Sequence, residues 1–282
     1  MEKTILLPLD FSEQSLIALE QSYNLAKLSK ASITILNVIK TTSGFWGVFS
    51  DEDKKEYEKK IEKKLKETAK KIDTEQGIDV RIIIRKGKTI EEIMRVADYL
   101  TPMVIIMGTS SGKSITRKII GSKTLHVIKT SKYPVISIKG KEFSTSCKNI
   151  LLPIDASKNT SQKVDLAIKL AKIFKSKITV VTAISKKNLS LIEKVNATLS
   201  EIKSKIENNK IICETDFIHA DDDKARMAKA LLNYAHKVNA DMVSIMTQQE
   251  HDISEFFLGS LAQNIIFSFD IPVLTITPKQ KK

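Results

Sequence analysis

The chain repeats itself, and this internal repeat limits its fold more than any other feature of the sequence. Residues 3–12 (KTILLPLDFS) recur 145 residues later as residues 148–157 (KNILLPIDAS). Two shorter motifs within residues 121–136, Gly-Ser and Tyr-Pro-Val-Ile, recur 138 residues later as Gly-Ser and Ile-Pro-Val-Leu within residues 259–274. Self-similarity at a fixed spacing indicates two copies of one structural unit.

Two copies of one domain account for the whole length. The chain has 282 residues, and single domains usually have about 100–200. We therefore predict a first domain at residues 1–142 and a second domain at residues 147–282, joined within the short polar stretch of residues 140–146.

Short apolar runs alternate with amphipathic segments in each copy. Residues 5–9 form an apolar run that is too short for a helix and typical of a strand buried on both faces. In residues 51–74, by contrast, apolar positions such as Tyr57, Ile61 and Leu65 recur every three or four residues, as on one face of a helix. In the first copy we predict strands at residues 5–9, 33–39, 80–84, 103–107 and 134–138, and helices after Ser12 and at residues 51–74, 90–100 and 121–130. In the second copy we predict strands at residues 150–154, 178–183, 211–218, 242–246 and 273–276. This alternation predicts an α/β fold with parallel strands, right-handed crossovers and helices on both faces of the sheet.

In such a sheet a ligand binds beyond the carboxyl ends of the strands. The first strand of each copy leads into an acid, Asp10 or Asp155, followed two residues later by Ser12 or Ser157. One interpretation of these residues is helix capping. The other is that the carboxylate accepts hydrogen bonds from a ribose or an amine, and the two roles can coexist.

The fourth strand of the first copy runs into a loop that starts at Gly108, and the next helix opens at residues 121–124 (GSKT). Glycine lets the backbone approach a ligand closely, and the N–H groups at a helix start attract phosphate. The segment therefore predicts a cradle for a polyphosphate. It does not match a P-loop, because that motif has four residues between its glycines, and Gly108 and Gly112 enclose three.

Taken together, these segments resemble the universal stress protein family, and the resemblance covers nearly all of both halves. The matching motifs are Pro-hydrophobic-Asp at residues 8–10 and 153–155, Asn37-Val38, the segment from Gly108 to Gly121-Ser122, and the closing strand at residues 133–136. The family implies two tandem Rossmann-like domains, each with a five-stranded parallel sheet of order 3-2-1-4-5. It also implies dimer-like pairing through the last strands, which we expect the two copies to satisfy within one chain. Whether two chains associate further is left open.

ATP-binding members of that family carry the motif Gly-two residues-Gly-nine residues-Gly-Ser/Thr. Here Gly108 fits the first position, whereas Ser111 occupies the middle position and Gly112 is displaced by one. The resemblance implies that Asp10 and the backbone of Val38 hold adenine and ribose, and that the later residues surround the phosphates. The ATP site implied in this way, with or without Mg²⁺, consists of Asp10, Val38, Met107, Gly108, Ser111, Gly112, Gly121, Ser122, Lys123 and Thr124.

The second copy departs from that motif. Met246 replaces the first glycine, Gln249 the second, and Ala183 stands where the first copy has Val38. Residues 108–121 carry three cationic side chains and no acid, whereas residues 246–259 carry three acids. Because this change turns an attractive field for a triphosphate into a repulsive one, we predict that only the first domain binds nucleotide.

The composition limits the other classes of function. The net charge of +13 suggests nucleic acid, but only 5 of the 46 basic residues are Arg, and Lys on helix exteriors mostly confers solubility. No stretch approaches the roughly 18 uncharged apolar residues of a membrane span. The first residues lack the features of a signal peptide, and two cysteines exclude a disulfide framework. We expect a cytoplasmic protein that binds neither nucleic acid nor membrane.

The remaining candidates carry less chemistry. The four histidines are isolated, so we expect no metal site, and Asp221–Asp223 precede a helix whose dipole they complement. The loop at residues 44–49 contains three aromatic residues, Phe45, Trp46 and Phe49. Three interpretations of this loop stay open: it folds back on its own domain, it covers the nucleotide, or it contacts a partner.

The leading hypothesis for function is a stress-response module that binds ATP in the first domain with little or no turnover. Slow ATP hydrolysis and a scaffold that needs no nucleotide are the alternatives.

Overall fold

The computed structural model describes residues 3–41, 47–109, 121–139, 147–155, 160–185, 192–247 and 258–277. Strands and helices alternate along both halves, as the sequence predicts. The first half contains β1 (Thr4–Pro8), α1 (Glu13–Ser29), β2 (Ser32–Ile39), α2 (Asp51–Gln76), β3 (Val80–Lys86), α3 (Thr89–Leu100), β4 (Val104–Gly108), α4 (Ser122–Thr130) and β5 (Val135–Ile138). The second half contains β6 (Asn149–Ile154), α5 (Thr160–Phe174), β7 (Lys177–Ser185), α6 (Ile192–Glu207), β8 (Cys213–Ala220), α7 (Lys224–Lys237), β9 (Met242–Met246), α8 (Ser260–Ser268) and β10 (Val273–Ile276).

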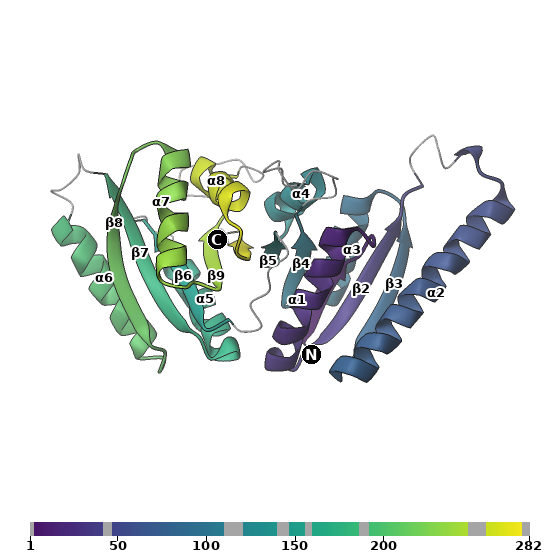
Figure 1. Ribbon diagram of the computed structural model, residues 1–282, viewed down its shortest axis with the longest axis horizontal. Coiled ribbons are helices and arrows are strands. Elements are labelled where there is room, and N and C mark those ends of the chain that lie inside the picture. Colours follow the sequence, from purple (N-terminus) through teal and green to yellow (C-terminus); the bar gives the residue numbers. More distant parts are fainter. Residues whose placement is uncertain are drawn as a thin grey trace.

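The strands form one ten-stranded sheet in the order β3-β2-β1-β4-β5-β10-β9-β6-β7-β8. Within each half every pairing is parallel, and the order is that of the predicted 3-2-1-4-5 arrangement, which is therefore confirmed. The two halves lie side by side, with α2 and α6 at the two outer ends of the molecule (Figure 1). The carboxyl ends of β1, β2 and β4 consequently meet at one edge of the first half.

Helices cover both faces of this sheet and enclose two apolar cores. Successive residues of β1 alternate between them, because neighbouring side chains of a strand point to opposite faces. Ile5 and Leu7 belong to the core beneath α1, α2, α5 and α6, whereas Leu6 belongs to the core beneath α3, α4, α7 and α8. Each core contains residues of both halves, so apolar packing is continuous along the molecule.

The two halves meet through an antiparallel ladder between β5 and β10, in which Ile136 lies opposite Leu274. Side chains reinforce the ladder from both halves. The hydroxyl of Thr275 donates to the carbonyl of Val135 at 3.0 Å, and the ammonium group of Lys139 donates to the carbonyl of Phe267 at 2.7 Å. These bonds join segments that are more than a hundred residues apart in the sequence.

The helix starts follow the capping pattern of the sequence. Ser12 is the N-cap of α1, with its hydroxyl oxygen accepting from the backbone N–H of Ser15 at 3.3 Å. Ser50 and Asp53 form a reciprocal capping box at the start of α2, and Asp223 caps α7 through the N–H of Arg226. These side chains satisfy N–H groups that have no partner within the helix.

One prediction about the core and one about the bounds of a strand differ from the structure. Tyr57 continues the apolar stripe of α2 in the sequence, yet it is 49% exposed, because the first turns of α2 face the edge of the first half rather than the core. The strand expected at residues 211–218 runs from Cys213 to Ala220 instead. Among the described residues, no helix combines the length and apolarity needed to cross a bilayer.

Candidate functional site

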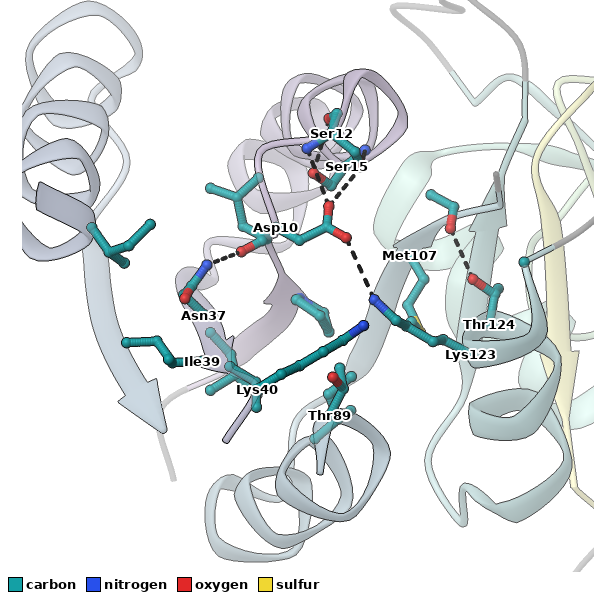
Figure 2. Close-up of a pocket in the computed structure, with 18 of the residues that line it drawn as sticks. Asp10, Ser12, Ser15, Asn37, Ile39, Lys40, Thr89, Met107, Lys123 and Thr124 are labelled. Carbon is teal, nitrogen blue, oxygen red and sulfur yellow. Dashed lines mark hydrogen bonds and ion pairs between the residues drawn. The ribbon is translucent and has the colours of Figure 1, made fainter. Parts of the chain in front are cut away.

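A pocket of about 490 Å³ lies at the carboxyl ends of β1, β2 and β4. Its walls also include the starts of α1, α2, α3 and α4 (Figure 2). Eight of the ten predicted site residues line this pocket, namely Asp10, Val38, Met107, Gly108, Gly121, Ser122, Lys123 and Thr124. The other two, Ser111 and Gly112, lie outside the described residues. The topology thus brings the two predicted parts of the site together, although they are about a hundred residues apart in the sequence.

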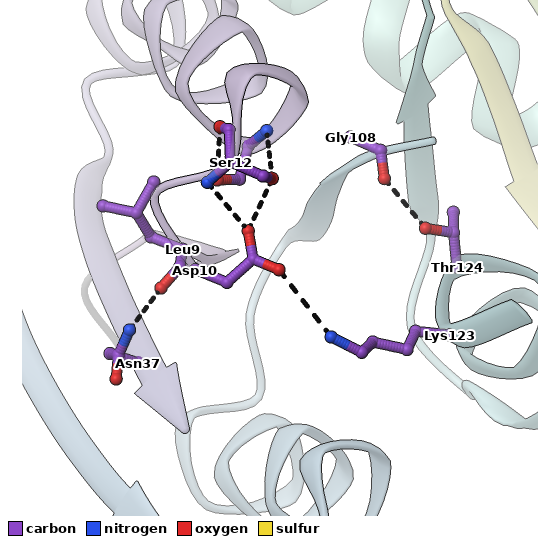
Figure 3. Close-up of polar contacts among 8 residues, drawn as sticks. Leu9, Asp10, Ser12, Asn37, Gly108, Lys123 and Thr124 are labelled. Carbon is purple, nitrogen blue, oxygen red and sulfur yellow. Dashed lines mark hydrogen bonds and ion pairs between the residues drawn. The ribbon is translucent and has the colours of Figure 1, made fainter. Parts of the chain in front are cut away.

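Asp10 is held in place by the start of α1. Its Oδ1 accepts hydrogen bonds from the backbone N–H of Ser12 at 3.1 Å and from the Ser12 hydroxyl at 2.6 Å. Its Oδ2 faces the ammonium group of Lys123, 3.7 Å away (Figure 3). Burial favours the neutral acid and would raise the pKa of Asp10, but the hydrogen bonds from Ser12 and Ser15, together with the charge of Lys123, outweigh it and lower the pKa. Asp10 therefore presents an ionised oxygen to the pocket at neutral pH.

The end of β2 is fixed against the end of β1. The side-chain amide of Asn37, which is buried, donates to the carbonyl of Leu9 at 2.7 Å. This bond holds the two strand ends in register and leaves Val38 and Ile39 in the wall of the pocket. The apolar surface they provide, with Met107 opposite, suits a flat ring better than a charged group.

Gly108 is required by packing between α1 and β4. A Cβ atom at this position would overlap the backbone carbonyl of Gln14 in the first turn of α1. The sequence attributes this glycine to a close approach of ligand and backbone, and the structure adds a second role, which is to let α1 start against the end of β4. Met246 occupies the equivalent position in the second half, since β9 and β10 pair in the register of β4 and β5.

Gly121 also has a structural role. Its backbone N–H donates to the carbonyl of Thr109, and the equivalent N–H of Gly259 donates to the carbonyl of Thr247 at 2.8 Å. Both glycines are the N-caps of short helices, α4 and α8. This shared helix start explains why Gly-Ser persists in the second half, where the rest of the motif does not.

Thr124 ties α4 to β4. Its hydroxyl is buried and donates to the carbonyl of Gly108 at 2.8 Å (Figure 3). The sequence predicts that the Thr124 hydroxyl binds phosphate, but this hydroxyl donates its hydrogen bond to another residue of the protein. Ser122 and Lys123, by contrast, are more exposed at the start of the same helix, where backbone N–H groups and the helix dipole favour an anion.

The pocket contains polar residues that the sequence does not single out. Lys40 follows β2 and, in Figure 2, extends across the pocket towards Lys123. The hydroxyl oxygens of Thr89 and Thr109 are buried at its lining and have no hydrogen-bond partner among the described residues. Buried polar groups usually have a partner, so these two hydroxyls are candidates for a hydrogen bond to a ligand or water. The sequence also does not predict that α2 lines the pocket. Its side chains there are those of Asp53, Lys54, Tyr57 and Ile61.

The second half keeps part of this polar set but has lost its two lysines and one threonine. At a sequence offset of 138, Leu261 replaces Lys123 and Ala262 replaces Thr124; at the offset of 145, Ser185 replaces Lys40. The second half instead has Lys163, whose ammonium group donates to the carbonyl of Pro153 at the end of β6, at 3.1 Å. Desolvation there lowers the pKa of Lys163, although the charge of Asp155 acts in the opposite direction.

Comparisons with known proteins match the chain either over both halves or over about one half. The model of the universal stress protein family matches residues 1–139 and again residues 146–277. Universal stress protein MJ0577 of Methanocaldococcus jannaschii is 33% identical over 157 residues, which cover 50% of this chain and 97% of that protein. The crystal structure of a universal stress protein from Archaeoglobus fulgidus has a TM-score of 0.78 at 24% identity, covers 97% of this chain and 98% of its own, and shows a shared fold. A universal stress protein in complex with cAMP matches 48% of this chain and 99% of its own, at 19% identity and a TM-score of 0.39.

Proposed function

This chain belongs to the universal stress protein family in two tandem copies, and from that membership and the pocket we propose that its first domain binds an adenine nucleotide, ATP in particular. We propose that the first domain comprises residues 1–142 and the second domain residues 147–282. The second domain serves as a structural partner that pairs with the first through β5 and β10. The protein acts as a stress-response module in which the nucleotide is a bound signal.

The observation that carries this proposal is the division of the first-domain pocket into an apolar surface, a carboxylate and a helix start with a lysine. Val38, Ile39 and Met107 offer a surface for a base. The ionised Oδ2 of Asp10 lies in the same pocket and can accept hydrogen bonds from ribose hydroxyls. Ser122 and Lys123 stand at the start of α4, where phosphate binds favourably. A nucleotide has these three parts in this order.

Binding in the first domain alone is favoured by the losses in the second. The positions of Lys40 and Lys123 hold Ser185 and Leu261 there, so two positive charges are missing. Each change removes attraction for a polyphosphate.

We propose binding with little or no turnover. Hydrolysis needs a base that positions and deprotonates water. Asp10 is the acid nearest to the phosphate side of the pocket, but its lowered pKa makes it a weak base, and its oxygens already face Ser12 and Lys123. Phosphate release in the presence of Mg²⁺ measures any residual hydrolysis.

A matched pair of substitutions tests the location of the site. Ser122 and Ser260 are the first residues of α4 and α8, so Ser122→Asp and Ser260→Asp make the same change in the two domains. An acid at a helix start does not destabilise the helix, but in the first domain it repels the phosphates. By calorimetry we expect Ser122→Asp to weaken ATP binding at least about tenfold, the effect of losing about 1.4 kcal/mol, and Ser260→Asp to leave it unchanged.

The opposite result, with Ser260→Asp weakening ATP binding and Ser122→Asp having no effect, would move the site to the second domain. Absence of any heat with the wild-type protein, together with no nucleotide released on denaturation, would favour the scaffold that needs no nucleotide. Mass spectrometry of the denatured supernatant identifies a nucleotide that co-purifies.

A further inference from the structure

The acidic groups of the pocket are poorly suited to bind a divalent cation. Mg²⁺ in nucleotide sites is usually held by one or two carboxylates together with phosphate oxygens. The pocket lining contains two carboxylates, Asp10 and Asp53. Asp53 accepts hydrogen bonds from the N–H and hydroxyl of Ser50 at 3.3 and 2.7 Å, so it serves the start of α2. Asp10 faces Ser12 with one oxygen and Lys123 with the other.

The segments of chain outside the described residues do not change this inventory. Residues 42–46 (TSGFW) and 110–120 (SSGKSITRKII), which border the pocket in sequence, contain no Asp, Glu, His or Cys. Within the described part of the chain, no three side chains of these types come together as a metal site. A cation at Oδ2 of Asp10 would also meet the ammonium group of Lys123, which lies 3.7 Å from that oxygen and repels it.

Positive charge is supplied by the protein itself. Lys40 and Lys123 line the pocket from opposite sides and extend towards one another (Figure 2). Lys54, a third cation of the lining, is paired with Asp51 at 3.2 Å. Among the described residues that line the pocket, Lys40 and Lys123 are two cations that a polyphosphate would meet at the side where α4 starts.

We infer that the first-domain pocket binds its nucleotide as the metal-free polyphosphate, with Lys40 and Lys123 neutralising the charge that a divalent cation neutralises in other nucleotide sites. This inference rests on the proposed function, since it specifies the ionic form of the same ligand. Metal-free ATP carries more negative charge than its Mg²⁺ complex, so it gains more from two ammonium groups. Removal of metal should therefore maintain or tighten binding.

Calorimetry with ATP, in EDTA and in excess MgCl₂, tests the inference on the full-length protein. We expect binding in EDTA that is at least as tight as in MgCl₂. In EDTA, Lys40→Met and Lys123→Met should each weaken binding by about tenfold, because each removes a charge-assisted contact. Lys71→Met is the control: Lys71 is an exposed lysine of α2 outside the pocket, and its replacement should leave the affinity unchanged. Circular dichroism verifies that each variant is folded.

Binding that occurs only with Mg²⁺ would overturn the inference while leaving the proposed function intact. Unchanged affinity of both Lys40→Met and Lys123→Met in EDTA would overturn it as well. If ATP bound under neither condition, the proposed function itself would fail, and this inference would fail with it.

Discussion

Gly108 illustrates how one residue can serve packing and a ligand site at once. The residue ends β4 at the pocket, yet its lack of a side chain is explained by the carbonyl of Gln14, which a Cβ atom would overlap. A side chain there displaces the start of α1, and with it Asp10 and Ser12. The arrangement of the pocket thus depends on a contact between a helix and a strand that holds without any ligand.

We predict that Gly108→Ala destabilises the protein by about 2 kcal/mol in the absence of nucleotide, the usual cost of overpacking a tight contact. Urea unfolding of the nucleotide-free protein measures this. Gly47→Ala is the control, because a Cβ atom at Gly47 meets no atom within 4 Å, and its effect should stay below about 0.5 kcal/mol. Equal stability of Gly108→Ala and wild type would contradict the packing role. It would instead favour the role predicted from the sequence, in which this glycine lets the backbone approach a ligand closely.

At the residue scale, the sequence predicts which types of group surround the site but not what each of them contacts. Asp10, Gly108 and Lys123, which the motif predicts as site residues, line one pocket. The motif does not show that the Thr124 hydroxyl is used by Gly108, because that bond joins two elements through the fold. It also misses Lys40, since the direction of a side chain just beyond a strand depends on the neighbouring elements.

Helix α2 has two faces with different roles. Only Leu65, Ala69 and Ile72 of its 26 residues are buried, and its first turns form a wall of the pocket through Tyr57 and Ile61. The apolar stripe in the sequence runs along the whole helix, so periodicity alone assigns all of it to the core. The structure divides the stripe, because the helix extends past the core to the edge where the pocket lies.

This division predicts opposite effects for two substitutions on α2. Tyr57→Ala should change the free energy of unfolding by less than about 0.5 kcal/mol, because the side chain is half-exposed. The same substitution should weaken ATP binding by roughly tenfold, because the ring lines the pocket and base–aromatic stacking contributes about 1–3 kcal/mol. Leu65→Ala should cost about 3 kcal/mol of stability, because Leu65 is fully buried. Chemical unfolding and calorimetry on both variants measure the two effects. A large loss of stability in Tyr57→Ala would indicate that Tyr57 belongs to the core, as the sequence predicts.

On the scale of the whole molecule, the two domains are parts of one packed body. The β5–β10 ladder completes a single sheet, and both apolar cores contain residues of each half. The strand order within each half was predictable from the family resemblance. The detailed contacts across the junction, such as Lys139 to Phe267, were not, because they depend on how two separately patterned units meet.

We predict that the protein unfolds in a single transition, because separation of the halves exposes the edges of β5 and β10 and part of each core. Native-state hydrogen exchange should show comparable, near-global protection for the amides of Ile136 and Leu274, which face each other in the ladder. Two separate transitions, with β5 and β10 exchanging at the stability of their own halves, would contradict this.

The β5–β10 ladder has a consequence for how such a molecule responds to its ligand. Because β5 and β10 belong to one polypeptide, their pairing does not depend on the protein concentration. If only one half takes up nucleotide, that half has no identical twin within the chain with which it could act cooperatively. For a single chain, occupancy then rises along a simple hyperbola, so one chain by itself reports nucleotide concentration in a graded way rather than as a switch.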